Sequence, residues 1–265
     1  MGKVKIKKKS TFIDMTAMSD VTVLLLTFFM LTSTFLQKEP TIVYTPSSVS
    51  EEKVPTSNLV TILVSSANKA AKEGEDPLAT EGKIFISFAG DQDSTWSTPK
   101  VKELILNQAV DIYNEQNKDN KKVTPIKLNE QQVKTFTEIN MLGTSFEHLP
   151  DLLNLSMTEI DKEQGDLENP FTGIPINGNK DYNGKLNDFQ IWCRAIYDVA
   201  SKIHKDRIDL SDADGKALED LYNGLMKDGT AIAIKADKDM PYQSVNMVFD
   251  NLQTMRLNKF SLMTA

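Results

Sequence analysis

Cysteine and histidine are scarce in this chain, and their scarcity excludes several classes of function. Cys193 is the only cysteine among 265 residues, so an intrachain disulfide is impossible. The only histidines, His148 and His204, do not stand at the spacing of a metal site or a catalytic triad. The glycines form neither a phosphate-binding loop nor a dinucleotide fingerprint. We therefore expect no enzyme, no metal and no cofactor.

Charge is unevenly distributed along the sequence. Residues 1–36 contain five lysines and two aspartates, a net charge of +3, so residues 37–265 carry −10 of the total of −7. A basic tip before an apolar run, followed by an acidic body, is typical of a membrane anchor rather than of a nucleic-acid-binding protein. The tail's charge can reflect topology alone or contact with partner loops and anionic lipid.

The apolar run over residues 15–36 is long enough to cross a bilayer. As a helix it spans roughly 33 Å, and a hydrocarbon core is about 30 Å thick. A cleaved signal peptide is the alternative, but this run is too long, contains an acid and precedes no A-x-A cleavage site. We expect residues 1–11 to be a cytoplasmic tail and residues 12–36 a transmembrane helix. The rest would then lie in the periplasm of a Gram-negative cell, as a single-pass inner-membrane protein.

Asp20 is the one acid within this apolar run. A carboxylate costs about 2.5–3.5 kcal/mol at the centre of a membrane helix, so it indicates a function. On a helix, Thr16, Thr27 and Thr34 share its face. We expect Asp20 to carry protons and the three threonines to support their path, which requires partner helices in the membrane. The alternative is an Asp20 that snorkels to the cytoplasmic interface, with hydroxyls that join helices.

The remaining sequence predicts an α+β domain, a small mixed sheet with helices. Residues 37–58 are rich in proline and serine and indicate a linker, in which Thr41–Tyr44 can add as a short edge strand. Strands over 59–65 and 83–88, then a helix from Pro99, form a first part over 59–117. A strand, a helix and a strand close the domain over 230–265, and their crossover predicts a parallel pair.

Residues 118–229 are mostly helical by pattern. Asn129 and Ser211 can cap helices, residues 163–185 indicate a loop, and a helix is expected over 185–204 with Cys193 on its apolar face. We interpret this region as a helical insertion that adds acidic surface to a domain able to fold without it, and expect it to carry specificity.

The residues around Asp20 resemble the N-terminal signature of the ExbD/TolR family. The matching run is Ile13-Asp14-Met15-Thr16-Ala17-Met18-Ser19-Asp20-Val21. Val43-Tyr44-Thr45-Pro46 is similar to the family's strand just outside the membrane, and Ala236-Asp237-Lys238 to its closing unit. The resemblance covers residues 10–48 and 230–265 well, 59–117 loosely and 118–229 not at all. Asp14 and Ala17 depart from the usual Asn and Pro.

The resemblance implies a proton-conducting stator of an ExbB–ExbD-like inner-membrane motor. Two copies would sit in a pentameric ExbB/TolQ-like ring, and proton binding at Asp20 would energise a TonB-like or TolA-like protein. Edge strands at Thr41–Tyr44 and Lys259–Met263 are candidate docking sites for a partner strand. A TolR-like role in envelope maintenance and a signal-anchored scaffold without a proton role remain alternatives. The expected partner-binding residues are Val43, Tyr44, Pro46, Asp237 and Lys238, although the last two also fit a solvated loop.

Overall fold

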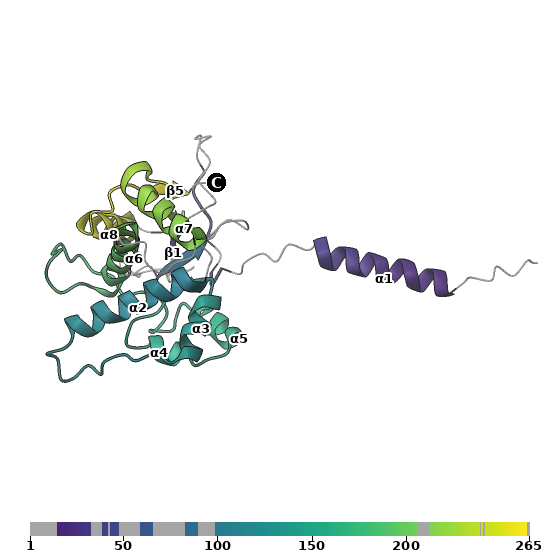
Figure 1. Ribbon diagram of the computed structural model, residues 1–265, viewed down its shortest axis with the longest axis horizontal. Helices are drawn as coiled ribbons and strands as arrows, with labels where there is room; N and C mark the ends of the chain where they lie inside the picture. The colour runs from purple at the N-terminus through teal and green to yellow at the C-terminus, as the bar shows by residue number, and fades with distance from the viewer. Residues whose placement is uncertain are drawn as a thin grey trace, which may run out of the picture. The chain divides into compact units, whose positions relative to one another are not determined.

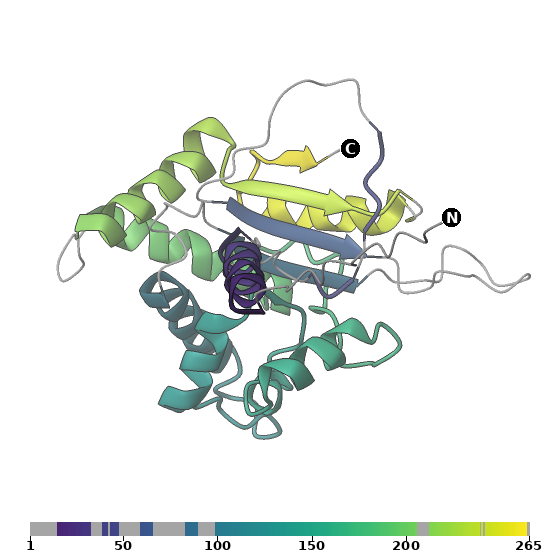
Figure 2. The same ribbon diagram turned by 90° about the vertical axis from the view of Figure 1, so that its right-hand side faces the viewer.

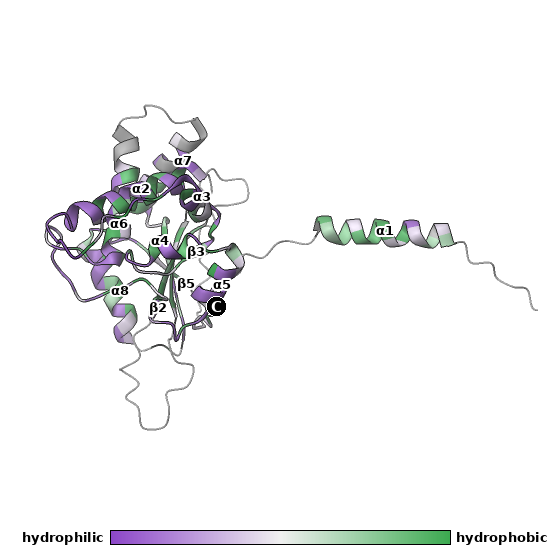
Figure 3. Cartoon of the chain, turned by 90° about the horizontal axis from the view of Figure 1, so that it is seen from below, coloured by the Kyte–Doolittle hydropathy of each residue, from purple (hydrophilic) through white to green (hydrophobic). Residues whose placement is uncertain are grey.

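The chain divides into two compact units, residues 1–38 and residues 39–265. The computed structural model describes residues 15–32, 39–41, 43–47, 59–65, 83–89, 99–205, 212–238, 240 and 242–263. In the first unit the described residues form one helix, α1 (Met15–Thr32), and Figure 3 colours most of it as hydrophobic. No helix in the described ranges reaches both the length and the apolar character of a membrane span.

The second unit is built on a five-stranded mixed sheet, with strand order β3-β2-β1-β4-β5. β1 pairs antiparallel with β2 and parallel with β4, and β4 pairs parallel with β5, as the sequence predicted for the last two strands. Figure 2 shows β5, β4, β1 and β2 side by side. The short strand β3 follows β2 at the far edge, and no sequence pattern predicted it. The strands are β1 (Leu59–Ser65), β2 (Lys83–Ala89), β3 (Met141–Leu142), β4 (Ile232–Ala236) and β5 (Ser261–Met263).

Helices cover one face of this sheet, where α2, α6 and α8 pack within one layer against it (Figure 1). Capping side chains fix where some of them begin. Asn129 and Gln132 form the capping box of α3, which confirms Asn129 as the cap, and Asn187 and Gln190 exchange the same pair of bonds at the start of α6. The helices are α2 (Pro99–Gln116), α3 (Glu130–Glu138), α4 (Leu149–Leu152), α5 (Met157–Gly165), α6 (Asp188–Lys205), α7 (Asp212–Asn223), the π-helix η3 (Gly224–Asp228) and α8 (Tyr242–Thr254).

The two faces of the sheet are covered very differently. Alternate residues of β1, β2 and β4 enter one large core with α2, α6 and α8, because side chains alternate across a strand. The opposite face carries a small second cluster, in which Leu63 and Phe85 are fully buried and Val43 and Met141 nearly so. Val43 reaches this cluster from the segment that follows the first unit.

Residues 118–229 are an integral part of the core. The Trp192 ring of α6 stacks on Phe136 of α3 at 5.8 Å between centroids and on Phe146 at 5.1 Å. Phe146 stacks in turn on Tyr113 of α2 at 5.0 Å. The expectation that the domain folds without this region is therefore not supported, since its removal would uncover α2. Cys193, on the same helix, is buried as expected.

The segment over residues 39–47 differs from its prediction. None of its described residues belongs to a strand, so the edge strand expected at Thr41–Tyr44 is wrong for those residues. The segment is not a plain linker either, because Thr41 and Val43 are buried. It lies against the face of the sheet that carries the second cluster, held by the Val43 side chain and by one backbone hydrogen bond from Lys238 to Tyr44, without joining a ladder. Ser211, expected to cap α7, lies outside the described residues.

Gly143 provides a test of the second cluster. A Cβ at this position would lie 2.0 Å from Cδ1 of the buried Phe85 ring, whereas a Cβ at Gly178 would meet nothing within 4 Å. We expect Gly143→Ala to lower the free energy of unfolding by about 1–3 kcal/mol or more, because the ring must move in a packed interior. Chemical denaturation measures the loss, and Gly178→Ala is the matched control. Equal stability of the two variants would contradict this packing.

Candidate functional site

Asp20 lies on α1, one turn after Thr16 and two turns before Thr27. The Thr27 hydroxyl donates to the Leu24 carbonyl at 2.9 Å, and the Ser19 hydroxyl donates to the Met15 carbonyl at 2.8 Å. Two helical turns are about 10 Å, so Thr27 is too far to bond Asp20 directly. Its oxygen keeps acceptor capacity for water. Thr34, the third expected hydroxyl, lies outside the described residues.

The apolar side chains of α1 are uncovered. Leu26, Phe28 and Phe29 are each at least 60% exposed, and Leu31 is 86% exposed. A contiguous apolar surface on a helix marks contact with protein or lipid. Asp20 is the only ionisable side chain of this helix. The described helix is therefore an apolar surface that carries one acid.

Two segments that are distant in sequence meet at one end of β4. We call this place the junction and use the name for residues 39–41 and 43–46 together with Lys235, Asp237 and Lys238. The Lys235 ammonium lies 2.7 Å from the Glu39 carboxylate, and the Lys238 amide donates to the Tyr44 carbonyl at 2.7 Å. Residues expected from the sequence to bind partners are thus brought together.

The side chains at the junction have unequal access to solvent. Tyr44 is 58% exposed, and Lys238 places its Nζ 6.0 Å from the centroid of the Tyr44 ring. Pro46 is also exposed and Asp237 is half-buried. Val43 is 7% exposed and belongs to the second cluster, so it anchors the segment rather than presenting a surface. A partner at this junction would meet Tyr44, Pro46 and Lys238.

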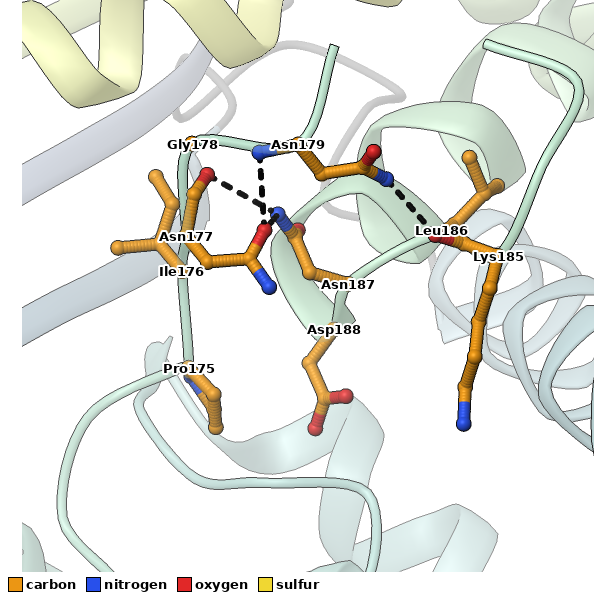
Figure 4. Close-up of a pocket in the computed structure, with 9 residues that line it drawn as sticks. All are labelled: Pro175, Ile176, Asn177, Gly178, Asn179, Lys185, Leu186, Asn187 and Asp188. Atoms are coloured by element: carbon orange, nitrogen blue, oxygen red, sulfur yellow. Dashed lines mark hydrogen bonds between the residues drawn. The ribbon is translucent and has the colours of Figure 1, made fainter. Parts of the chain in front are cut away.

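A polar cleft at the start of α6 was missed by the sequence analysis. It has a volume of about 700 Å³, and its wall contains Asn177, Asn179 and Asn187 (Figure 4). Asn187 donates to the side-chain oxygens of Asn177 and Asn251, both at 2.9 Å, and so ties the loop to α8. The sequence signal was the asparagine-rich stretch over 177–187, which indicated only a loop.

Asp188 also lines this cleft, at the first position of α6. Its Oδ2 accepts a hydrogen bond from the Phe146 amide at 2.8 Å. Burial raises the pKa of the Asp188 carboxyl above its ordinary value, and the charge of Glu147 adds to the increase. The Phe146 amide and Lys185 act in the opposite direction. Ionised Asp188 is therefore less favourable in the fold than in water.

The chain belongs to the ExbD/TolR family, since the family model described as "Biopolymer transport protein ExbD/TolR" matches residues 7–265. The matched range includes residues 118–229, where the motifs alone showed no resemblance. No curated protein and no solved structure gives a match. Membership implies a proton-channel, stator-like role associated with the inner membrane, in a family whose members are not enzymes and generally work with ExbB or TolQ and with TonB or TolA.

The raised pKa of Asp188 predicts how Asp188→Asn changes stability with pH. The pKa of Asp188 is higher in the folded protein than in the unfolded chain. Protonated Asp188 therefore contributes its full stability at pH values below the unfolded-state pKa, and this contribution is lost as the pH rises through the folded-state pKa. Asparagine keeps an acceptor for Phe146 and never ionises. We expect Asp188→Asn to raise the melting temperature at pH 7 relative to the natural protein, with the difference shrinking towards pH 4. A difference that grows on acidification would contradict this assignment.

Proposed function

We propose that this chain is the proton-conducting stator subunit of an ExbB–ExbD-like motor, which uses the proton motive force to energise a TonB-like protein for outer-membrane transport. Membership in the family supports the stator-like part of the proposal. The observation that carries the proton role is Asp20, the only ionisable residue of an apolar, uncovered helix. An acid in such a surface requires a partner that shelters it.

In this proposal residues 12–36 cross the inner membrane, with residues 1–11 in the cytoplasm. The five lysines near the N-terminus favour that orientation. The exposed apolar side chains of α1 would contact lipid and the helices of a pentameric ExbB/TolQ-like ring. A second copy of the chain would occupy the same ring, so that two Asp20 carboxyls share the pathway.

Proton transfer would proceed by alternate protonation of Asp20 in the two copies. The Thr27 hydroxyl already donates to the helix backbone, so its oxygen would order water rather than bond the acid. Thr16, one turn from Asp20, and Thr34 are proposed to extend this wetted stripe. One charge that moves through 100 mV releases about 2.3 kcal/mol, which sets the work available for each proton.

Transmission to the TonB-like protein would use the junction. Glu39 follows directly after the first unit, and its ion pair with Lys235 fixes the chain to the sheet at that point. Tyr44, Pro46 and Lys238 are the exposed groups beside this attachment, with Asp237 half-buried and Val43 as the buried anchor. We assign partner contact to this set of side chains.

Asp20→Asn tests the proton role at a single atom. The amide has the size of the carboxyl but cannot cycle a proton, so we expect assembly with the ring subunit to persist while energised uptake falls to background. Uptake by cells and co-purification of the ring subunit are the two measurements. Asp14→Asn is the matched control, because the family usually carries asparagine there and activity should persist. Full uptake by Asp20→Asn cells would refute the proton role and leave a scaffold.

Deletion of the gene separates the ExbD-like role from the TolR-like one. Loss of TonB-dependent uptake with intact envelopes supports the proposal, whereas leaky envelopes at division with normal uptake would support a TolR-like role.

Photocrosslinking tests the junction as a partner surface. A benzophenone amino acid at Tyr44 should crosslink to the TonB-like protein in energised cells, because that ring is exposed beside Lys238. The same probe at Met226, which is 37% exposed and lies in η3 before the opposite end of β4, is the control and should not crosslink. Crosslinking at Met226 alone would move the partner surface away from the junction.

A further inference from the structure

Arg256 occupies a backbone conformation that normally requires glycine. Its φ is +62°, the only positive φ of a non-glycine residue in the described ranges. The Arg256 amide donates to Gln253 and the Leu257 amide donates to Leu252, which is the bonding pattern of a Schellman motif at the end of α8. Glycine is the usual residue there, because a side chain is sterically unfavourable in this conformation. The contacts of the Arg256 side chain are therefore of particular interest.

The guanidinium of Arg256 stacks on the Tyr182 ring, 4.7 Å from its centroid. Arg194 of α6 places its own guanidinium 4.9 Å from the same centroid. Two guanidinium groups thus contact one aromatic ring. Cation–π attraction holds each guanidinium against the ring and leaves the N–H groups at its edge available for hydrogen bonds. We call this arrangement the arginine–tyrosine stack.

The charges around the stack are only partly balanced. Arg194 lies 3.1 Å from Asp198, and Lys180 lies 3.8 Å from Asp250. Arg256 has no carboxylate partner among the described residues. The exposed Asp181 side chain accepts a hydrogen bond from its own loop, through the Asn183 amide at 3.0 Å. The guanidinium of Arg256 is thus held against the Tyr182 ring and, among the described residues, has no carboxylate to balance its charge.

The polar cleft lies beside the stack, because Tyr182 belongs to the loop that forms the cleft wall. Lys185 and Asp188 both line it, and Figure 4 shows their side chains pointing away from the asparagine cluster. Asn177 accepts bonds through its Oδ1, and its side-chain NH₂ makes no hydrogen bond among the described residues. The cleft therefore offers a free amide donor at Asn177, on the same loop as Tyr182, while the ammonium of Lys185 points away from it.

We propose that the arginine–tyrosine stack and the adjoining cleft bind an acidic segment of a partner protein. A carboxylate side chain of the segment takes the free edge of Arg256 as a bidentate pair, and the Asn177 amide donates to the neighbouring polypeptide. The body of the chain carries −10, so basic polypeptides are attracted over much of its surface and acidic ones only at such a local site. This inference stands apart from the proton role of Asp20.

Fluorescence anisotropy with the full-length protein in detergent tests the proposal. The probe is a short fluorescein-labelled peptide rich in glutamate, and its counterpart carries glutamine at the same positions. We expect the glutamate peptide to bind, and Arg256→Gly to weaken it at least tenfold without lowering the melting temperature appreciably, because glycine suits the backbone. Lys162→Ala, which removes one positive charge from α5, is the matched control and should bind as the natural protein does.

Further variants and probes separate the alternatives. Tyr182→Phe should keep binding and Tyr182→Leu should weaken it, because only the aromatic ring holds the guanidinium planes. Equal binding of the glutamine peptide, or undiminished binding by Arg256→Gly, would overturn the proposal. Binding of phosphatidylglycerol vesicles without binding of the glutamate peptide would overturn it in favour of a lipid site.

Discussion

The packing of Trp192 against the aromatic rings around it holds the second unit, residues 39–265, together. Trp192 is 1% exposed, and its stack joins α6 to α3, to Phe146 and through Phe146 to Tyr113 of α2. Its Nε1 makes no hydrogen bond among the described residues, so burial and ring contact, rather than polar bonding, fix it there. Because α2 covers the sheet, the position of the sheet depends on this contact between residues far apart in sequence.

The other face of the sheet, away from α2, is only lightly covered. Its cluster needs Val43, which comes from the segment that links the two units, to bury Leu63 and Phe85. The ion pair of Glu39 with Lys235 and the bond from Lys238 to Tyr44 hold the segment in place. The contacts that hold residues 39–44 on the sheet therefore also complete the second cluster. A pull on residue 39 acts first on an ion pair and a few apolar contacts, not on the main core.

Local patterns predicted the elements whose causes are local. Alternating β-branched residues gave β1 and β2, Asn129 gave the start of α3, and Gly229, at φ +71°, gave the end of the helix before β4. Two separate family motifs named Tyr44 and Lys238 as candidate residues, and the structure brings the two into contact. Their spacing of almost two hundred residues carries no such information by itself.

Features that depend on tertiary contact were not predictable. β3 is two residues long, and it pairs with β2 only because Ser87 and Ile86 are already in the sheet. Residues 39–47 have the composition of a linker, but Val43 is buried since an apolar surface lies opposite it. The polar cleft and Asp188 likewise arise where a loop meets α6.

The ends of α8 and of the helix before it, η3, show how far a helix end can be predicted from sequence. Both η3 and α8 are followed by a residue with positive φ, Gly229 in one case and Arg256 in the other. Glycine in the sequence predicts such a turn because it adopts a positive φ without steric cost, whereas arginine does not predict one. The conformation of Arg256 is imposed by its surroundings: Leu257 is buried beneath the turn, and the guanidinium rests on Tyr182. Arginine is an unfavourable residue for this helix end, yet here the turn holds its charged side chain against an aromatic ring. This combination is the reason we propose a binding role for Arg256 in addition to its contribution to the turn.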